Sequence, residues 1–414
     1  MAMTLDEKLE RLAMVAVRVG LGMEAGKTPP QQVLISAPLE AAPLVRKIVE
    51  QSYKAGATLV TPLFSDDECV LARYKLAADA SFDQTNEWMA EGVHKAFQQN
   101  TARLAIAGGN PALLAGQDPG KIARANKAGS IAMKPAMEMI TRHDINWNIV
   151  AAATPAWAKL MFPKDSEEEG VAKLWEAIFA ASRVLGADPV AEWKRHSDGL
   201  QKKTAFLNER NYKSLRYRGP GTELELGLSD GHKWLGGGCI AGNGIPCMPN
   251  IPTEEVFTTP HRERAEGKVR STKPLSHQGT LIRDIEVKFA GGKIVEAHAS
   301  EGEEALRRLL DTDEGARRLG EVALVPHSSP ISASGLMFYN TLFDENAASH
   351  IALGQAYSTC LHGGDTMSKE ELAKRGANES LIHVDWMIGS GEVDIDGVTQ
   401  TGAVEPLMRK GEWC

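Results

Sequence analysis

The residues best suited to chemistry lie in the second half of the sequence, beginning with the motif HVDWMIG. Its His383 and Asp385 are two residues apart in an expected strand, so their side chains point to the same face. An imidazole and a carboxylate directed at one point can bind a borderline divalent metal ion. Taken alone, however, so short a motif favours a structural or solvated role.

A second histidine, His350, belongs to the segment FDENAASHIALGQAY. The preceding LMFYNTLF has the composition of a strand, and residues 344–346 are capping types, so we expect an Ala-rich helix after them. In this helix His350 would share a face with Tyr357, seven residues later. Taken alone, His350 fits a hydrogen-bonded core histidine better than a metal ligand.

Two glutamates lie in segments of a similar kind. Glu321 stands directly before the apolar run Val322–Val325, at the mouth of an expected strand. Glu255 lies in the irregular segment NIPTEEVFTTP, between Pro252 and Pro260. Either glutamate by itself would be interpreted as a surface residue.

Together, these segments resemble the M29 aminopeptidase family. The resemblance is carried by NIPTEEVFTTP, LGEVALVP, LMFYNTLFDENAASHIALGQAY and HVDWMIGSGEVDIDG, and it covers the second half of the chain. The first half resembles the family only in length and in its α/β pattern. The resemblance implies a homodimer that acts on peptides, with a catalytic Tyr357 and two divalent metal ions per chain bound by Glu255, Glu321, His350, His383 and Asp385.

The chemistry of these side chains agrees with that assignment. Three carboxylates and two neutral imidazoles offset most of the charge of two cations, and mixed N/O ligands suit Zn, Co, Mn or Mg. Two such ions polarise the scissile carbonyl and activate a shared water, while Tyr357 donates to the oxyanion. Glu321 or Asp385 is favoured as the bridging carboxylate. Glu254 and Glu345 are candidates for the general base, although capping or solvation explains each as well.

Two other functions compete with a metalloaminopeptidase. Two histidines and one aspartate also form the ligand set of mononuclear Fe(II) oxygenases, including ring-cleaving dihydroxypyridine dioxygenases of related fold. Glu255 and Glu321 favour the hydrolase, because a single iron needs no additional pair of carboxylates. A scaffold with structural metals is less favoured, since structural zinc sites are usually rich in cysteine.

The first half of the chain is expected to form a separate α/β domain. Short apolar runs alternate with helical patterns, which is typical of a mainly parallel sheet covered by helices. Further strands are expected in TARLAIAGGN and DINWNIVAAA. The first two strands are expected near residues 33–36 and 58–61, and helices are expected near residues 41–55, 86–98 and 167–185.

After a polar helix near residues 191–203 the pattern changes to alternating strands with Gly turns, as in an antiparallel sheet. The clearest hairpin is IRDIEVKFAGGKIVEAHA, with Gly291 and Gly292 at its tip. The sequence therefore predicts an N-terminal α/β domain over residues 1–200 and an α+β catalytic, metal-binding domain with antiparallel strands over residues 201–414.

Composition excludes several classes of protein. The 414 residues carry a net charge of −8, so the phosphate-neutralising surface needed for nucleic acids is not expected. No apolar stretch reaches the roughly 18 residues of a membrane span. Acidic residues near the N-terminus (Asp6, Glu7) disagree with a signal peptide, so we predict a cytoplasmic protein. Five cysteines without a C-x-x-C pair predict no disulfide framework, and Cys239 and Cys247 are expected to be unreactive thiols.

Overall fold

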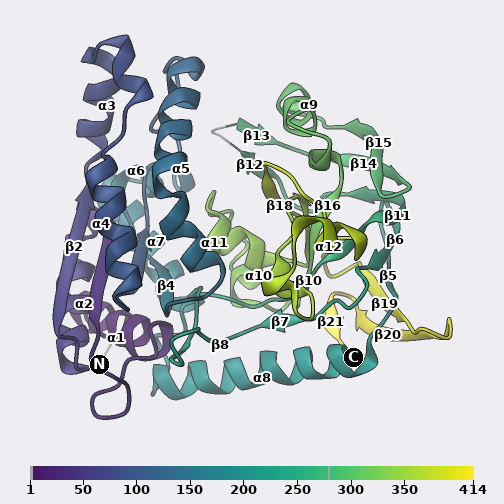
Figure 1. Cartoon of the computed structure of the whole chain (residues 1–414), viewed down its shortest axis with the longest axis horizontal. Coiled ribbons are helices and arrows are strands. Elements are labelled where there is room, and N and C mark those ends of the chain that lie inside the picture. Colours follow the sequence, from purple (N-terminus) through teal and green to yellow (C-terminus); the bar gives the residue numbers. More distant parts are fainter. Residues whose placement is uncertain (1–2, 278–279) are drawn as a thin grey trace. The chain divides into compact units, whose positions relative to one another are not determined.

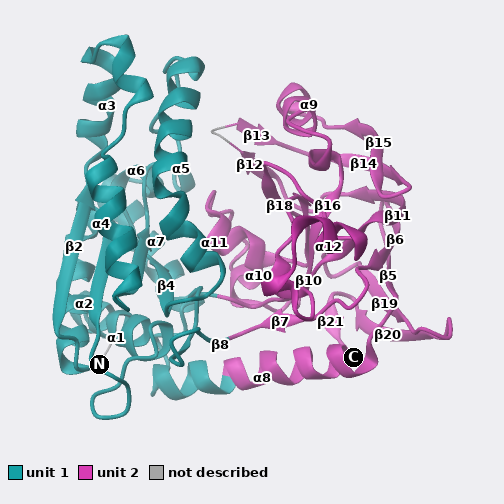
Figure 2. Cartoon of the chain, viewed as in Figure 1, with its two compact units in different colours: residues 1–195, 238–252 teal, residues 196–237, 253–414 magenta. Residues whose placement is uncertain are grey.

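The structure is a computed structural model that describes residues 3–277 and 280–414 (Figure 1). It divides into two compact units (Figure 2). Unit 1 comprises residues 1–195 and 238–252, and unit 2 comprises residues 196–237 and 253–414. The chain therefore enters unit 2 within helix α8 (Pro189–Arg210), returns to unit 1 for fifteen residues, and then completes unit 2.

Unit 1 is built on a four-stranded sheet in the order β2-β1-β3-β4, and all of its strand pairs are parallel. The mainly parallel sheet predicted for the first half is therefore present. The strands are β1 (Gln32–Pro38), β2 (Leu59–Ser65), β3 (Ala102–Ala107) and β4 (Trp147–Ala151).

Helices with one apolar stripe accompany this sheet. In α2, Leu44, Val45 and Ile48 are buried at the spacing of one helical face. The helices of unit 1 are α1 (Leu5–Val15), α2 (Ala42–Lys54), α3 (Asp67–Leu76), α4 (Glu87–Gln98), α5 (Pro119–Thr141), α6 (Pro155–Met161) and α7 (Glu167–Ala181). None of the helices within the described ranges is long and apolar enough to cross a membrane.

Unit 2 contains an eight-stranded sheet in the order β15-β14-β11-β6-β5-β19-β20-β21, whose neighbours are all antiparallel. The predicted hairpin is β14–β15, and Gly291 and Gly292 both have positive φ at its tip. The strands are β5 (Ser214–Gly219), β6 (Thr222–Leu228), β11 (Pro260–Arg270), β14 (Glu286–Ala290), β15 (Lys293–His298), β19 (Asp394–Val398), β20 (Val404–Arg409) and β21 (Glu412–Trp413).

A second sheet of unit 2 has the order β18-β17-β16-β10-β7, again antiparallel throughout. One apolar core, which includes Tyr217, Phe289, Ile351 and Trp386, joins the two sheets and the helix α9 (Glu303–Leu310). The strands of the second sheet are β7 (Leu235–Gly236), β10 (Val256–Thr258), β16 (Leu319–Leu324), β17 (His350–Gly354) and β18 (His383–Met387).

The helix expected around His350 is wrong. Residues His350–Gly354 form the strand β17, and all five of its residues are buried. A short apolar run that is buried on both faces has no period by which a strand can be told from a helix. The strand expected in LMFYNTLF is also wrong, because that segment ends in the short helix α11 (Thr341–Asp344), followed by a 3-10 turn at Glu345–Ala347.

Candidate metal centre

The second sheet of unit 2 brings the predicted ligands to one face. Glu321 on β16 and Asp385 on β18 both lie opposite Ala352 on the strand β17 between them. Residues that are opposite each other, or two apart along a strand, share a face of the sheet. His350 is two residues before Ala352, and His383 is two residues before Asp385, so all four side chains project from the same face. The small side chain of Ala352 leaves room between the two carboxylates.

Glu255 joins this face from the next strand. It directly precedes β10, in which Phe257 lies opposite Ala323 of β16, and Ala323 lies opposite His350. Since Glu255 is two residues from Phe257, it projects on the same side as His350. The same-face geometry predicted for His383 and Asp385 therefore extends to all five predicted ligands.

The five side chains form two groups that share one residue. In the first, His350 Nε2 lies 3.3 Å from a carboxylate oxygen of Glu255 and 3.7 Å from one of Glu321. In the second, His383 Nε2 lies 3.5 Å from Glu321 and 3.5 Å from Asp385. Within each group one ligand atom per residue lies within 4.8 Å of the others. Glu321 belongs to both groups.

Each imidazole is oriented by a backbone carbonyl. His350 Nδ1 lies 3.1 Å from the oxygen of Ala348, and His383 Nδ1 lies 2.8 Å from the oxygen of Gln355. A carbonyl only accepts hydrogen bonds, so Nδ1 carries a proton and Nε2 is the nitrogen that faces the carboxylates. This is the arrangement by which proteins fix metal-binding histidines.

Burial makes this cluster electrostatically unusual. Glu321 is only 5% exposed and His350 only 1%. Burial raises the pKa of Glu321 to about 7. Burial also acts to lower the pKa of His383, but the charges of Asp385 and Glu321 outweigh it and raise that pKa to about 9. The cluster thus holds protons where no other cation balances its carboxylates.

The donor set fits divalent cations. Three carboxylates converge here, and two imidazoles face them. Among the described residues, Oε2 of Glu255 is a buried oxygen that accepts no hydrogen bond. Buried charges that are left unpaired are costly, and oxygen-rich sets with imidazoles are the ligands that such cations prefer.

A further carboxyl, that of Glu345, interacts with the cluster. Burial raises its pKa well above the usual value, and the negative charges of Glu255 and Asp385 add to that shift. The sequence interpretation treated this residue as a cap or a solvated candidate base. Its place in a turn of buried neighbours, Asn346 and Ala347, becomes visible only in the structure.

Asn346 supports the site from behind. Its side-chain oxygen, in a residue with no exposed surface, accepts a 2.7 Å hydrogen bond from the backbone N–H of Glu254. This bond fixes the segment that ends in Glu255. The neighbouring Glu254 lies 3.6 Å from His196 Nε2 through its carboxylate. Sequence reasoning assigned Asn346 only to capping and missed this role.

Tyr357 lies near the site, but the element that positions it differs from the prediction. It lies after β17, at the start of the 3-10 turn Ser358–Cys360, rather than on a helical face. Its ring centroid is nevertheless 4.8 Å from that of His383. Tyr357 is 37% exposed, but partial burial, together with the charges of Glu321 and Asp385, raises the pKa of its phenol well above the usual value. The phenol therefore remains a neutral hydrogen-bond donor near the cluster.

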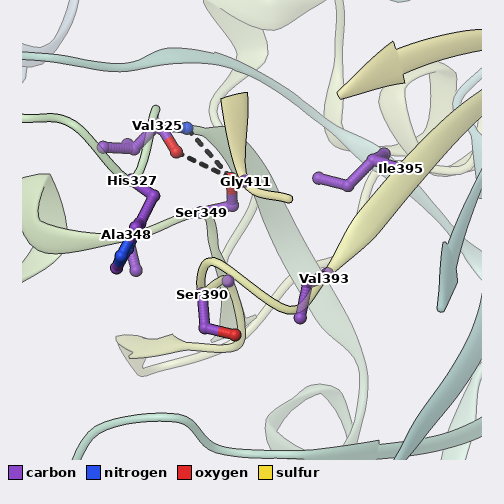
Figure 3. A pocket seen from close by; sticks show the side chains of 9 residues that line it. Val325, His327, Ala348, Ser349, Ser390, Val393, Ile395 and Gly411 are labelled. Carbon is purple, nitrogen blue, oxygen red and sulfur yellow. Dashed lines mark hydrogen bonds between the residues drawn. The ribbon is translucent and has the colours of Figure 1, made fainter. Parts of the chain in front are cut away.

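Behind the site, Ser349 joins two strands of the sheet. Its hydroxyl donates to the carbonyl of Val325 (3.1 Å) and accepts from the N–H of the same residue (3.0 Å), as Figure 3 shows. The adjoining cavity, lined by His327 and Gly411 among others, has a volume of about 10 Å³. That is room for about one water molecule, so this cavity is too small to be a substrate pocket.

These features define a class of metal-dependent protein with a buried, oxygen-rich centre, and comparison with known proteins gives the class its family. Residues 5–413 match the family described as thermophilic metalloprotease (M29). The chain belongs to this family, and the resemblance drawn from its four motifs is confirmed.

The relatives match along their whole length. Aminopeptidase T of Thermus thermophilus is 52% identical, and the match covers 98% of both chains. Aminopeptidase AmpS of Bacillus subtilis is 43% identical over 99% of both. The solved structure of wild-type AmpT from Thermus thermophilus gives a TM-score of 0.93 at 50% identity, covering 99% of this chain and 100% of that one. A 2,5-dihydroxypyridine dioxygenase from Pseudomonas putida KT2440 gives 0.53 at 12% identity, which shows a common fold alone.

Proposed function

We propose that this protein is a binuclear metalloaminopeptidase that removes N-terminal amino acids from peptides. The observation that carries the proposal is the pair of ligand groups that share Glu321 on one buried face of the sheet. Relatives named aminopeptidases, 40–52% identical over nearly the full chain, support the same activity.

The two groups assign the ligands. Glu255, Glu321 and His350 would hold one divalent ion, and Glu321, His383 and Asp385 the other. Of the two carboxylates that the sequence favours as the bridge, Glu321 is supported by its place in both groups. Glu345 belongs to neither group. Zn, Co, Mn and Mg all suit this set.

Two divalent ions held by these residues would supply Lewis acidity for the scissile carbonyl and for the attacking water. The remaining contribution comes from the chain itself. Tyr357 remains protonated beside His383 and donates a hydrogen bond to the oxyanion that develops as the carbonyl is attacked. The Nδ1–H bonds of both histidines keep their Nε2 atoms directed inward, so the site needs little reorganisation during the reaction.

The test is hydrolysis of an aminoacyl anilide before and after exhaustive chelation, followed by addition of each metal. Activity should disappear with the metal and return with at least one of the four ions. The N-acetylated form of the same anilide is the matched control, and it should not be cleaved because an aminopeptidase requires a free α-amine. Undiminished hydrolysis by protein that metal analysis shows to be empty would overturn the proposal.

A mononuclear Fe(II) dioxygenase is the alternative function. The fold shared with one such enzyme supports this alternative. The additional carboxylates of Glu255 and Glu321 argue against it, because a single-iron site does not need them. Oxygen uptake with a dihydroxypyridine in the presence of Fe(II), without anilide hydrolysis under any metal, would favour that alternative. The homodimer and the cytoplasmic location stay predictions.

A further inference from the structure

Two cysteines of unit 1 lie opposite each other in a short hairpin. Cys239 on β8 (Cys239–Ile240) pairs with Cys247 on β9 (Pro246–Cys247) in antiparallel register. Their sulfur atoms are 3.7 Å apart. Residues opposed in an antiparallel pair have Cα atoms about 4.5–5.5 Å apart, within the range of about 4.4–6.8 Å seen in disulfides. The unreactive thiols expected from the sequence are thus a facing pair.

The hairpin is held in place by a network of partly buried side-chain amides. At its turn, Asn243 donates to the side-chain oxygens of Asn100 (2.7 Å) and Asn146 (3.0 Å). The N–H of the adjacent Gly242 donates to the carbonyl of His143 (2.7 Å). Because the backbone on which both cysteines stand is fixed in this way, their sulfurs can meet by rotation of the side chains, without refolding.

The two thiols are hydrogen-bonded to each other and lie beside a histidine. Cys239 is half-buried, and its sulfur lies 3.5 Å from Nδ1 of His143. The hydrogen bond from Cys239 lowers the pKa of the buried Cys247 thiol. A pair that shares one proton loses the other more readily than an isolated thiol, and the thiolate is the form of cysteine that reacts.

We propose that Cys239 and Cys247 form a redox site. Hydrogen peroxide oxidises the pair to a disulfide, and a dithiol reduces the disulfide back to two thiols. One thiolate attacks a peroxide oxygen, which breaks the O–O bond, releases hydroxide and leaves a sulfenic acid. The second sulfur then displaces that hydroxyl, which leaves as water. Two thiols and one peroxide become one disulfide and two waters, and two electrons pass from sulfur to oxygen. Reduction is two steps of thiol–disulfide exchange.

The sequence makes the modification easy to observe. No lysine or arginine lies between Lys233 and Arg262, so trypsin releases both cysteines in one peptide. Full-length protein treated with hydrogen peroxide should give this peptide with a mass lower by two hydrogen atoms and without reaction towards a maleimide. Dithiothreitol should restore both thiols. Oxidation of Met248, in the same peptide, adds an oxygen and is distinguished by mass.

Matched variants distinguish disulfide formation between Cys239 and Cys247 from oxidation of the other cysteines. Cys69→Ser and Cys414→Ser replace two exposed cysteines and should leave the loss of two hydrogens unchanged. Cys239→Ser should abolish it, and the remaining Cys247 should then react with maleimide more strongly after peroxide than in the parent protein. Melting curves show that each variant is folded.

Two outcomes would overturn the proposal. In the first, the 234–262 peptide keeps both thiols while peroxide oxidises Cys69 and Cys414. In the second, the double variant Cys239→Ser, Cys247→Ser binds one metal ion fewer than the parent protein while its aminoacyl-anilide activity is unchanged. That result would assign the pair to a soft metal ion rather than to a disulfide. The thiol and mass measurements do not depend on peptidase activity, so they test the disulfide whether or not the proposed function holds.

Discussion

Unit 1 and unit 2 both contain clusters of polar side chains, but the clusters differ in how their hydrogen-bond donors and acceptors are paired. In unit 1, Gln31, Asn100, Asn146 and Asn243 hydrogen-bond to one another, with donors matched to acceptors. In unit 2, the carboxylates of Glu255, Glu321 and Asp385 face one another with only imidazoles between them. A closed network of this kind stabilises a fold, whereas convergent groups of one charge require something that the chain does not supply. The difference favours unit 2 as the unit that binds the metal ions.

Glu321→Gln should give the largest effect, because this side chain belongs to both ligand groups. A neutral amide is a poorer ligand, so metal content and activity should fall together. The activity loss should exceed the roughly 100- to 1,000-fold that removal of one oxyanion donor costs. Steady-state kinetics and metal analysis on one preparation measure both. Glu296→Gln, an exposed change on β15, is the control. Two ions per chain with near-normal rates in the Glu321 variant would remove this residue from the site.

Tyr357→Phe should have the next largest effect. The ring and its contact with His383 are retained, so bound metal and KM should change little. Loss of the donated hydrogen bond should lower kcat by about 100- to 1,000-fold. Tyr212→Phe is the matched control. It removes a phenol hydroxyl that donates a hydrogen bond to Glu405, and it should leave kcat unchanged. A kcat near that of the parent protein would contradict the assignment of Tyr357, and a parallel loss of metal would make it a ligand.

The comparison between the units is sharpest for two asparagines with no exposed surface, Asn146 and Asn346. Either residue replaced by Ala should lower stability by about 1–3 kcal/mol, because buried partners lose a hydrogen bond. Only Asn346→Ala should also weaken metal binding, by roughly 10- to 100-fold, since it releases the segment that ends in Glu255. Metal titration of both variants measures this. Equal metal affinities would show that Asn346 has a purely structural role.

Sequence reasoning was right where a local rule was sufficient. The i, i+2 spacing places His383 and Asp385 on one strand face, and the Gly291-Gly292 turn forms the hairpin at the predicted place. It was wrong at His350, where burial on both faces removes the period that separates strand from helix. The candidate ligands came from the family resemblance, and no local pattern joins Glu255 to His350 across strands.

Other features were beyond local rules altogether. Residues 238–252 are rich in glycine and lie between two strands of unit 2, yet they pack in unit 1 through the contacts of Asn243 with Asn100 and Asn146. Such contacts between distant parts of the chain leave no trace in local composition. The pairing of Cys239 with Cys247 depends on the same segment, as does its turn at Asn243.

The smallest expected effect is a dependence of the melting temperature on pH, and it has opposite signs with and without metal. In metal-free protein, the pKa of Glu321 is raised from 4.5 to about 7 and that of His383 from 6.5 to about 9. A group whose pKa is raised by folding binds protons more tightly in the folded state. Its stabilising contribution is therefore complete below the unfolded pKa and is lost as pH rises through the folded pKa.

Metal-free protein should consequently melt at progressively lower temperature between about pH 4.5 and pH 9, with Glu321 acting in the lower part of this range and His383 in the upper part. In loaded protein, cations and protons compete for the same imidazoles, so higher pH strengthens metal binding and with it stability. The gap between the two melting curves should widen as pH rises. His383→Gln should flatten the upper part of the metal-free curve. Because the charge of His383 lowers the pKa of Glu321, its loss should also move the lower part of the curve to higher pH. Parallel curves for metal-free and loaded protein would mean that the titrating groups lie outside the metal centre, and the contrast between the units would then need another explanation.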